Sequence, residues 1–180
     1  MNDEVSLEVV YPSPIERVWQ ALTTKSDLER WLLPNDFEAE LGKTFRLRRK
    51  RADDVRCEIV ALEEPFRLVY TWECDDAPLS VVSWTLTAVD DDSTRVQLRH
   101  EPAGVEMQCR LGLAWSRALR RGLPWVLGVS HVSIGSGYRL QTKGKENDLG
   151  SHGGRAKLAR RALVRSLVAA HERPHRLYRR

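Results

Sequence analysis

The sequence has no apolar run long enough to cross a bilayer, and Met1 to Glu4 lack the basic and then apolar character that is typical of a secretion signal. We therefore expect a cytoplasmic protein. Cysteine is also scarce: Cys57, Cys74 and Cys109 are too few and too widely spaced for a disulfide framework or for paired zinc knuckles. We predict that they are small buried hydrophobic residues.

Motifs of catalysis are missing as well. There is no G-x-S-x-G elbow for a nucleophilic serine and no clear Cys-His-acid arrangement. His171 to His175 match the H-E-x-x-H zinc motif, but Pro174 disrupts the helical turn that would align the two ligands. Gly42 to Thr44 are similar to the end of a phosphate-binding loop, but Phe37 stands where its first glycine should be. We predict no catalytic residue, no metal site and no cofactor.

Acidic residues are scarce in the second part of the chain. The net charge of the 180 residues is +4, yet Lys and Arg number 13 against 22 Asp and Glu through Glu106, and 16 against 3 afterwards. The last segment, residues 155–180, carries nine Lys or Arg and one Glu, which would attract phosphates. Because Tyr178 is its only aromatic residue, bases would find nothing to stack on, and we expect a solvated basic tail that does not bind nucleic acid.

Two short helices are predicted after a first strand, in which Val5, Leu7 and Val9 alternate with more exposed positions as far as Pro12. Ser13 with Glu16 three residues later is typical of a capping box, and Pro14 suits the first helical position. The helix that follows has one apolar face, formed by Ile15, Val18, Trp19 and Leu22. A second helix begins after Thr24 and carries Leu28, Trp31 and Leu32.

Alternating apolar residues and polar turns then predict a run of antiparallel strands. Phe37 to Glu40 and Thr44 to Arg49 form a hairpin around Leu41-Gly42-Lys43, with Phe45 and Leu47 facing inward. The later strands are expected at residues 55–62, 66–73, 81–89 and 94–101.

The helical period returns from about Val105 to Gly128, with Pro124 able to kink or end the helix. We therefore divide the chain into a folded domain, residues 1–128, and a Gly- and Ser-rich polar linker, residues 129–154. A basic C-terminal tail with a helical pattern follows, residues 155–180.

This order of elements, with "SPIERVWQALTTKSDLERWLLP" after the first strand, resembles the START-like (SRPBCC) superfamily. It is most similar to the branch named after the activator of the heat-shock chaperone ATPase, over about Val5 to Gly128. The resemblance implies an α+β helix-grip fold: a curved antiparallel sheet wrapped around a long C-terminal helix, with two short helices after the first strand. In that fold the space between helix and sheet is often a ligand cavity.

Aromatic and apolar residues on the predicted inner faces suggest what such a cavity would bind. Four of the six tryptophans lie there, and Tyr70 and His100 could supply polar contacts. We expect a small hydrophobic or aromatic ligand, bound without chemistry. The predicted binding residues are Trp31, Tyr70, Trp72, Trp84, Leu86, Leu98, His100, Leu111, Trp115 and Leu119.

Two other functions remain open. The resemblance implies a protein-interaction module, with the acidic side of the sheet or the basic tail docking a partner. Some START-like relatives are aromatic cyclases, and others protect their producer against enediyne antibiotics. For sacrificial protection, a glycine near the drug would be attacked, with Gly104 and Gly112 as candidates.

Overall fold

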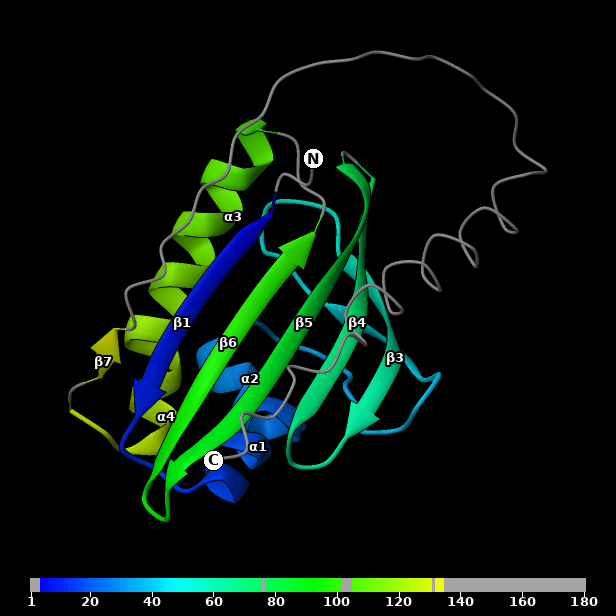
Figure 1. Ribbon diagram of the computed structural model, residues 1–180. Coiled ribbons are helices and arrows are strands. Elements are labelled where there is room, and N and C mark those ends of the chain that lie inside the picture. Colours follow the sequence, from blue (N-terminus) through cyan, green and yellow to red (C-terminus); the bar gives the residue numbers. More distant parts are fainter. Residues whose placement is uncertain (1–3, 76, 102–104, 131, 135–180) are drawn as a thin grey trace, which may run out of the picture. The chain divides into compact units, whose positions relative to one another are not determined.

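The computed structural model describes residues 4–75, 77–101, 105–130 and 132–134, which all lie in the first compact unit of the chain, Met1–Gly144. One antiparallel sheet has seven strands in the order β2-β3-β4-β5-β6-β1-β7, with the helices packed against one face (Figure 1). We call this face the inner face. The elements are β1 (Val5–Tyr11), α1 (Ile15–Thr23), α2 (Lys25–Trp31), β2 (Thr44–Leu47), β3 (Val55–Glu63), β4 (Arg67–Cys74), β5 (Ala77–Asp90), β6 (Ser93–Glu101), α3 (Val105–Arg117), the π-helix η1 (Ala118–Gly122), α4 (Leu123–Leu127) and β7 (Ser133–Ile134).

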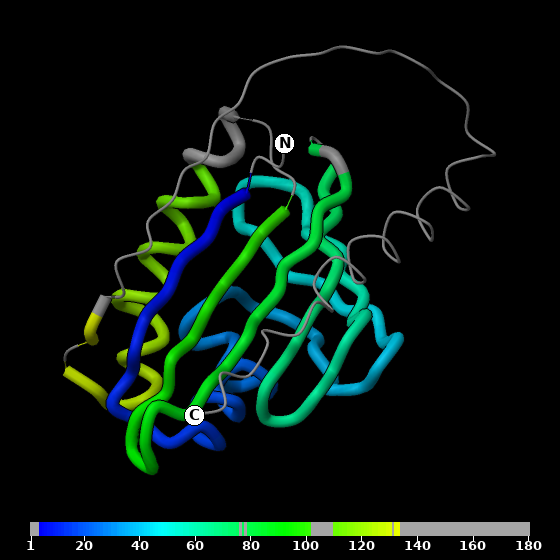
Figure 2. The backbone as a smooth tube through the Cα atoms, viewed as in Figure 1, coloured from blue at the N-terminus to red at the C-terminus, as the bar shows by residue number. Residues whose placement is uncertain are grey.

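The predicted α+β helix-grip fold is confirmed. Strands β2 to β6 form a meander, and β1 closes it by pairing with β6, although the two are far apart in sequence (Figure 2). In this register Val5 lies opposite His100 and Leu7 opposite Leu98, so that their side chains share the inner face. These four residues are all buried.

Helix α1 has the predicted apolar face but not the predicted cap. Ile15, Val18, Trp19 and Leu22 are buried, as their spacing indicates. The Ser13–Glu16 capping box, however, is wrong: the residue before α1 is Pro14, and no side chain caps the helix. Ser13 is itself buried, and its carbonyl accepts a hydrogen bond from Thr94 Oγ1 at 2.7 Å. It therefore fastens the end of β1 to β6.

The predicted hairpin around Gly42 is also wrong in its first half. Residues 37–40 are not a strand, and β2 pairs with β3, so that Phe45 lies opposite Cys57. Gly42 has a φ of 80°, a backbone conformation that glycine adopts without strain. Its N–H donates to the carbonyl of Ile59 at 2.8 Å. The turn therefore fastens the segment after α2 to β3.

The C-terminal helix is interrupted by η1, whose last residue lies against α2. A Cβ atom on Gly122 would meet the carbonyl oxygen of Trp31 at 2.7 Å, so only glycine fits at this close approach. On the other side, Tyr11 donates its hydroxyl to the carbonyl of Leu119 at 2.7 Å. The wider π turn precedes Pro124, whose ring would clash with the carbonyl four residues earlier in a regular α-helix.

The remaining strand predictions agree with the structure to within a few residues at each end. Strand β7 lies in the range predicted as a linker, and it pairs with β1 through Val9 and Val10. Cys57 and Cys74 are buried, as predicted, whereas the Cys109 side chain lies outside the described part. Within the described residues, no helix is long and apolar enough to cross a membrane.

Candidate functional site

Four tryptophans from α2, β4, β5 and α3 meet in the core, as their predicted inner faces suggest. Trp84 contacts Trp31 and Trp115 edge to face, with ring centroids 5.9 and 5.5 Å apart, and Trp72 lies 5.6 Å from Trp115. Such edge-to-face pairs are favourable because the positive edge of one ring meets the negative face of the next. The rings therefore pack on one another instead of surrounding an open space.

His100 lies at the centre of a hydrogen-bonded chain. The indole Nε1 of Trp115 is 3.0 Å from Nδ1 of His100, and since an indole N–H can only donate, Nδ1 is the acceptor and carries no proton. The proton of the neutral ring is then on Nε2, which donates to Ser80 Oγ at 2.9 Å. Ser80 in turn donates to the carbonyl of Trp72 at 3.2 Å. Burial lowers the pKa of His100 to about 3, so the ring is neutral near pH 7.

This chain leaves His100 and Ser80 without the arrangement that catalysis needs. Both ring nitrogens of His100 are occupied, and its side chain is inaccessible to solvent. In a Ser-His pair the histidine accepts the serine proton, whereas here it donates to the hydroxyl. His100 therefore joins α3 to the sheet and offers no free atom to a ligand.

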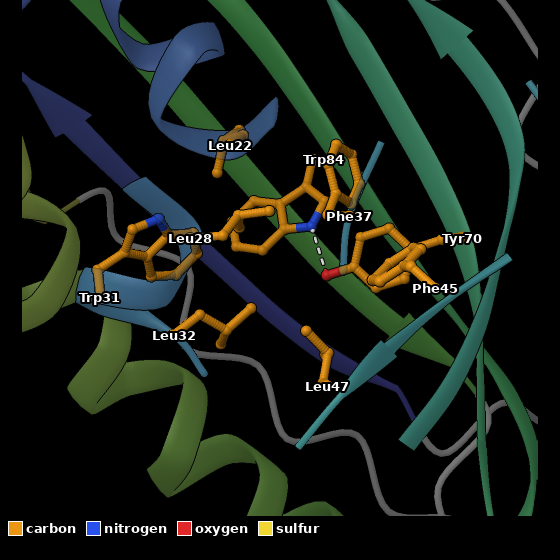
Figure 3. Close-up of a pocket in the computed structure, with 9 residues that line it drawn as sticks. All are labelled: Leu22, Leu28, Trp31, Leu32, Phe37, Phe45, Leu47, Tyr70 and Trp84. Atoms are coloured by element: carbon orange, nitrogen blue, oxygen red, sulfur yellow. Dashed lines mark hydrogen bonds between the residues drawn. The ribbon is translucent and has the colours of Figure 1, made fainter. Parts of the chain in front are cut away.

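A small hollow lies beside this aromatic core, between α2, β2 and the inner face of the sheet (Figure 3). The cavity volume is about 10 Å³. The empty space of the whole hollow is about 240 Å³, but this larger figure includes open solvent at its mouth. Its wall is apolar or aromatic throughout. The lining residues are Leu22, Leu28, Trp31, Leu32, Phe37, Phe45, Leu47, Tyr70 and Trp84.

The Tyr70 hydroxyl is the one oxygen-bearing side-chain group of this wall, and it lies near the middle of the side chains drawn in Figure 3. Its oxygen accepts a hydrogen bond from the indole N–H of Trp84 at 3.1 Å. Burial raises the pKa of Tyr70 far above its ordinary value, so the phenol stays protonated. It can therefore still donate a hydrogen bond.

The hollow is not where the predicted binding residues are centred. Three of the ten line it: Trp31, Tyr70 and Trp84. The structure buries five of the others in the core, namely Leu86, Leu98, His100, Trp115 and Leu119, and packs two partly exposed ones against it, Trp72 and Leu111. Of the two candidate glycines, Gly112 lies buried on α3, and Gly104 is outside the described residues.

Six lining residues were not among the predicted binding residues: Leu22, Leu28, Leu32, Phe37, Phe45 and Leu47. The inward faces predicted for Phe45 and Leu47 were a usable signal, since both are buried. For Phe37 there was no usable signal, because the strand predicted at residues 37–40 is not there and its pattern could not indicate that Phe37 is buried. Among the described residues, no group of three or more His, Cys, Asp or Glu side chains could hold a metal ion.

Comparison with known proteins assigns the family. The sequence profile described as "Activator of Hsp90 ATPase homolog 1-like protein" matches residues 12–127. The chain belongs to this family. No curated protein matches it significantly in sequence.

Solved structures of relatives agree with this assignment. CalU16 from Micromonospora echinospora is 25% identical, with a TM-score of 0.62 over 69% of this chain and 75% of that one. DynU16, described as a protein in the dynemicin biosynthetic locus, is 23% identical, with a TM-score of 0.60 over 66% and 45%. PFC0360w, an Hsp90 activator from Plasmodium falciparum, is 19% identical, with a TM-score of 0.58 over 71% and 97%. At these last two identities the likeness concerns the fold alone.

Proposed function

We propose that the domain binds a small apolar or aromatic molecule in the hollow between α2, β2 and the sheet, and that it does no chemistry on it. The supporting observation is a wall of nine apolar or aromatic side chains that contains one hydroxyl group. Binding sites for small molecules have this composition, with mostly apolar surfaces and a few placed polar groups. This site lies beside α2, away from the long-helix cavity that the family resemblance implies.

The ligand must be small, and the wall must move to admit it. An apolar cavity of about 150 Å³ can hold benzene, whereas the enclosed part of this hollow has room for about one water molecule. We expect the Leu32 side of the wall to move, because Leu32 follows the end of α2 and is only partly buried. Phe37, by contrast, is buried, and hydrogen bonds of Asn35 hold the segment around it.

The ionisable groups near the hollow support binding over catalysis. Burial raises the pKa of the Cys57 thiol, so it is not a ready nucleophile at neutral pH. Tyr70 is likewise held in its neutral form, and both nitrogens of His100 are occupied. A binding role needs no ionised or free side chain, so it is compatible with a neutral Cys57, a neutral Tyr70 and a fully hydrogen-bonded His100.

The experiment is an NMR titration of the full chain with α-methylstyrene, followed by the indole N–H signals of Trp31 and Trp84. We expect saturable shifts in the wild type. Leu32→Trp should abolish them by filling the mouth, whereas Leu33→Trp, next to it but outside the lining, should not. A wild type that shows no saturable shift, or equal binding by the two variants, would overturn the proposal.

A second candidate is docking to an acidic protein surface, which a patch on the C-terminal helices favours. Trp125 is 63% exposed, and the Arg30 guanidinium stacks on its ring at 4.7 Å. Arg117, Arg120 and Arg121 are exposed on the same helices. Exposed tryptophan and arginine are typical of the residues that dominate protein interfaces.

The family name suggests the assay for this candidate: the rate of ATP hydrolysis by an Hsp90 chaperone with and without the protein. Docking through the patch predicts that Trp125→Ala loses any stimulation. Phe66→Ala should retain it, because Phe66 is also exposed but precedes β4, outside the patch. Stimulation that survives Trp125→Ala would exclude this surface.

A further inference from the structure

Two buried tyrosines of this domain differ in how their hydroxyl groups are satisfied. Tyr11 donates its hydroxyl to the carbonyl of Leu119 at 2.7 Å. Tyr70 accepts from Trp84, but among the described residues no acceptor for its own O–H is found. A phenol has both a donor and an acceptor function, so half of the capacity of Tyr70 is unused.

An unused donor is unfavourable at this position. Tyr70 is 4% exposed, the ring of Phe45 packs beside it at 5.4 Å, and leucine side chains from the helices face it across the hollow. The Cys57 thiol is near enough to interact with the phenol electrostatically, but among the described residues it accepts no hydrogen bond from it. A buried donor without an acceptor loses its hydrogen bond to water and gains nothing in return. Natural proteins retain few such groups, and those they retain are often functional.

A water molecule is a poor partner for this hydroxyl. A buried water is held by about three hydrogen bonds. In this hollow a water could accept one hydrogen bond from Tyr70, but it would find no side-chain partner for the others. The N–H of Trp84 already donates to the Tyr70 oxygen, and the remaining lining side chains except Trp31 are hydrocarbon. The indole N–H of Trp31 is occupied too, because it donates to the carbonyl of Ala21 at 2.8 Å. A ligand that combines one acceptor with an apolar body fits these surroundings better.

We propose that the ligand is a neutral, single-ring-sized compound with a carbonyl-type oxygen, which accepts a hydrogen bond from the Tyr70 hydroxyl while its apolar part lies against the leucines of α1 and α2. This inference rests on the proposed function, whose site it uses. Acids are excluded as ligands because the lining contains no Lys, Arg or His that could pair with a buried carboxylate. Neutral ketones, aldehydes and esters remain.

The test compares two probes of nearly equal shape, acetophenone and α-methylstyrene, which differ by a carbonyl oxygen in place of a methylene group. Affinities are measured by NMR for the wild type, Tyr70→Phe and Tyr11→Phe. The decisive quantity is the ratio of the two affinities, because it cancels general effects of a substitution on the pocket. We expect Tyr70→Phe to reduce the preference for acetophenone about three- to tenfold. Tyr11→Phe removes the same atom elsewhere and should leave the ratio unchanged.

The outcomes separate the two proposals. If both probes bind and the ratio is the same in Tyr70→Phe and the wild type, the carbonyl inference is overturned and the pocket stands. If neither probe binds the wild type, both proposals fail. Should Tyr70→Phe not fold, the infrared C=O stretch of ¹³C-labelled acetophenone on the wild type decides: a shift to lower wavenumber relative to an alkane solvent supports the hydrogen bond, and no shift overturns it.

Discussion

Trp115 on α3 and His100 on β6 are joined by a hydrogen bond in which the indole N–H donates to Nδ1 of the imidazole at 3.0 Å. The bond exists only while His100 is neutral, because protonation at Nδ1 would place two donors face to face. The contact between the C-terminal helix and the sheet is therefore tied to the charge of one buried side chain.

This relationship predicts that acid destabilises the fold through His100. In the folded state its pKa is lowered from 6.5 to about 3 by burial, so below pH 6.5 the unfolded chain takes up a proton that the folded chain does not. The free energy of unfolding should then fall with decreasing pH between 6.5 and 3, with a slope that approaches about 1.4 kcal/mol per pH unit. Urea unfolding at several pH values measures this slope. His100→Gln, which cannot titrate, should lack this contribution, and an equal slope in the variant would refute the assignment.

Glu4 predicts an effect of the opposite sign. Desolvation raises its pKa from 4.5 to about 7, and a hydrogen bond and charge repulsion from Glu101 add to this, while Arg99 at 3.4 Å lowers it. The folded chain thus binds a proton more tightly than the unfolded chain. Stability from this group is greatest below pH 4.5 and is lost as the pH rises towards 7. In Glu4→Gln this loss should disappear, which the same unfolding series would detect as a flatter profile between pH 4.5 and 7.

Most of the sheet could be predicted because several strands, β1 among them, bury alternate residues. In β4 the period placed Leu68 and Tyr70 correctly on the inner face, but it did not show that Val69 and Thr71 on the other face are buried too. The capping box failed for a reason that lies outside the local sequence. Ser13 is held by Thr94, a residue of β6, and no rule about helix starts anticipates that contact.

The candidate site was only partly predictable, since its walls come from segments that are distant in sequence. The aromatic residues Tyr70 and Trp84 could be assigned to it from strand periodicity. Phe37 could not, because it lies in an irregular segment whose path depends on the pairing of β2 with β3. The sequence also could not predict how tightly the core residues fill the space between the helices and the sheet, because packing depends on side-chain shapes that a hydrophobic pattern does not contain.

For Gly122→Ala, helix propensity and packing predict opposite changes in the free energy of unfolding. In a free helix, Gly→Ala stabilises by about 1 kcal/mol. Here the new Cβ would lie 2.7 Å from the backbone oxygen of Trp31, so either η1 or α2 must shift. We expect Gly122→Ala to lower the free energy of unfolding by about 1–3 kcal/mol, the usual effect of overpacking. Chemical denaturation measures it, and a stabilised variant would show that the two helices separate easily.

Ser80 and Ser83 form a matched pair on β5, one on each face of the sheet, and they predict opposite effects of the same substitution. Ser80 Oγ accepts from His100 and donates to the Trp72 carbonyl, so Ser80→Ala leaves a buried N–H without its partner. We expect this change to cost about 1–3 kcal/mol of stability.

Ser83 Oγ is also buried, but within the described residues it has no hydrogen-bond partner. Removing this hydroxyl leaves no other group without a hydrogen bond, so Ser83→Ala should be neutral or stabilising. Thermal and urea unfolding of the two variants compare them directly. Equal losses would mean that the hydrogen bonds of His100 contribute no more than the packing of a small side chain.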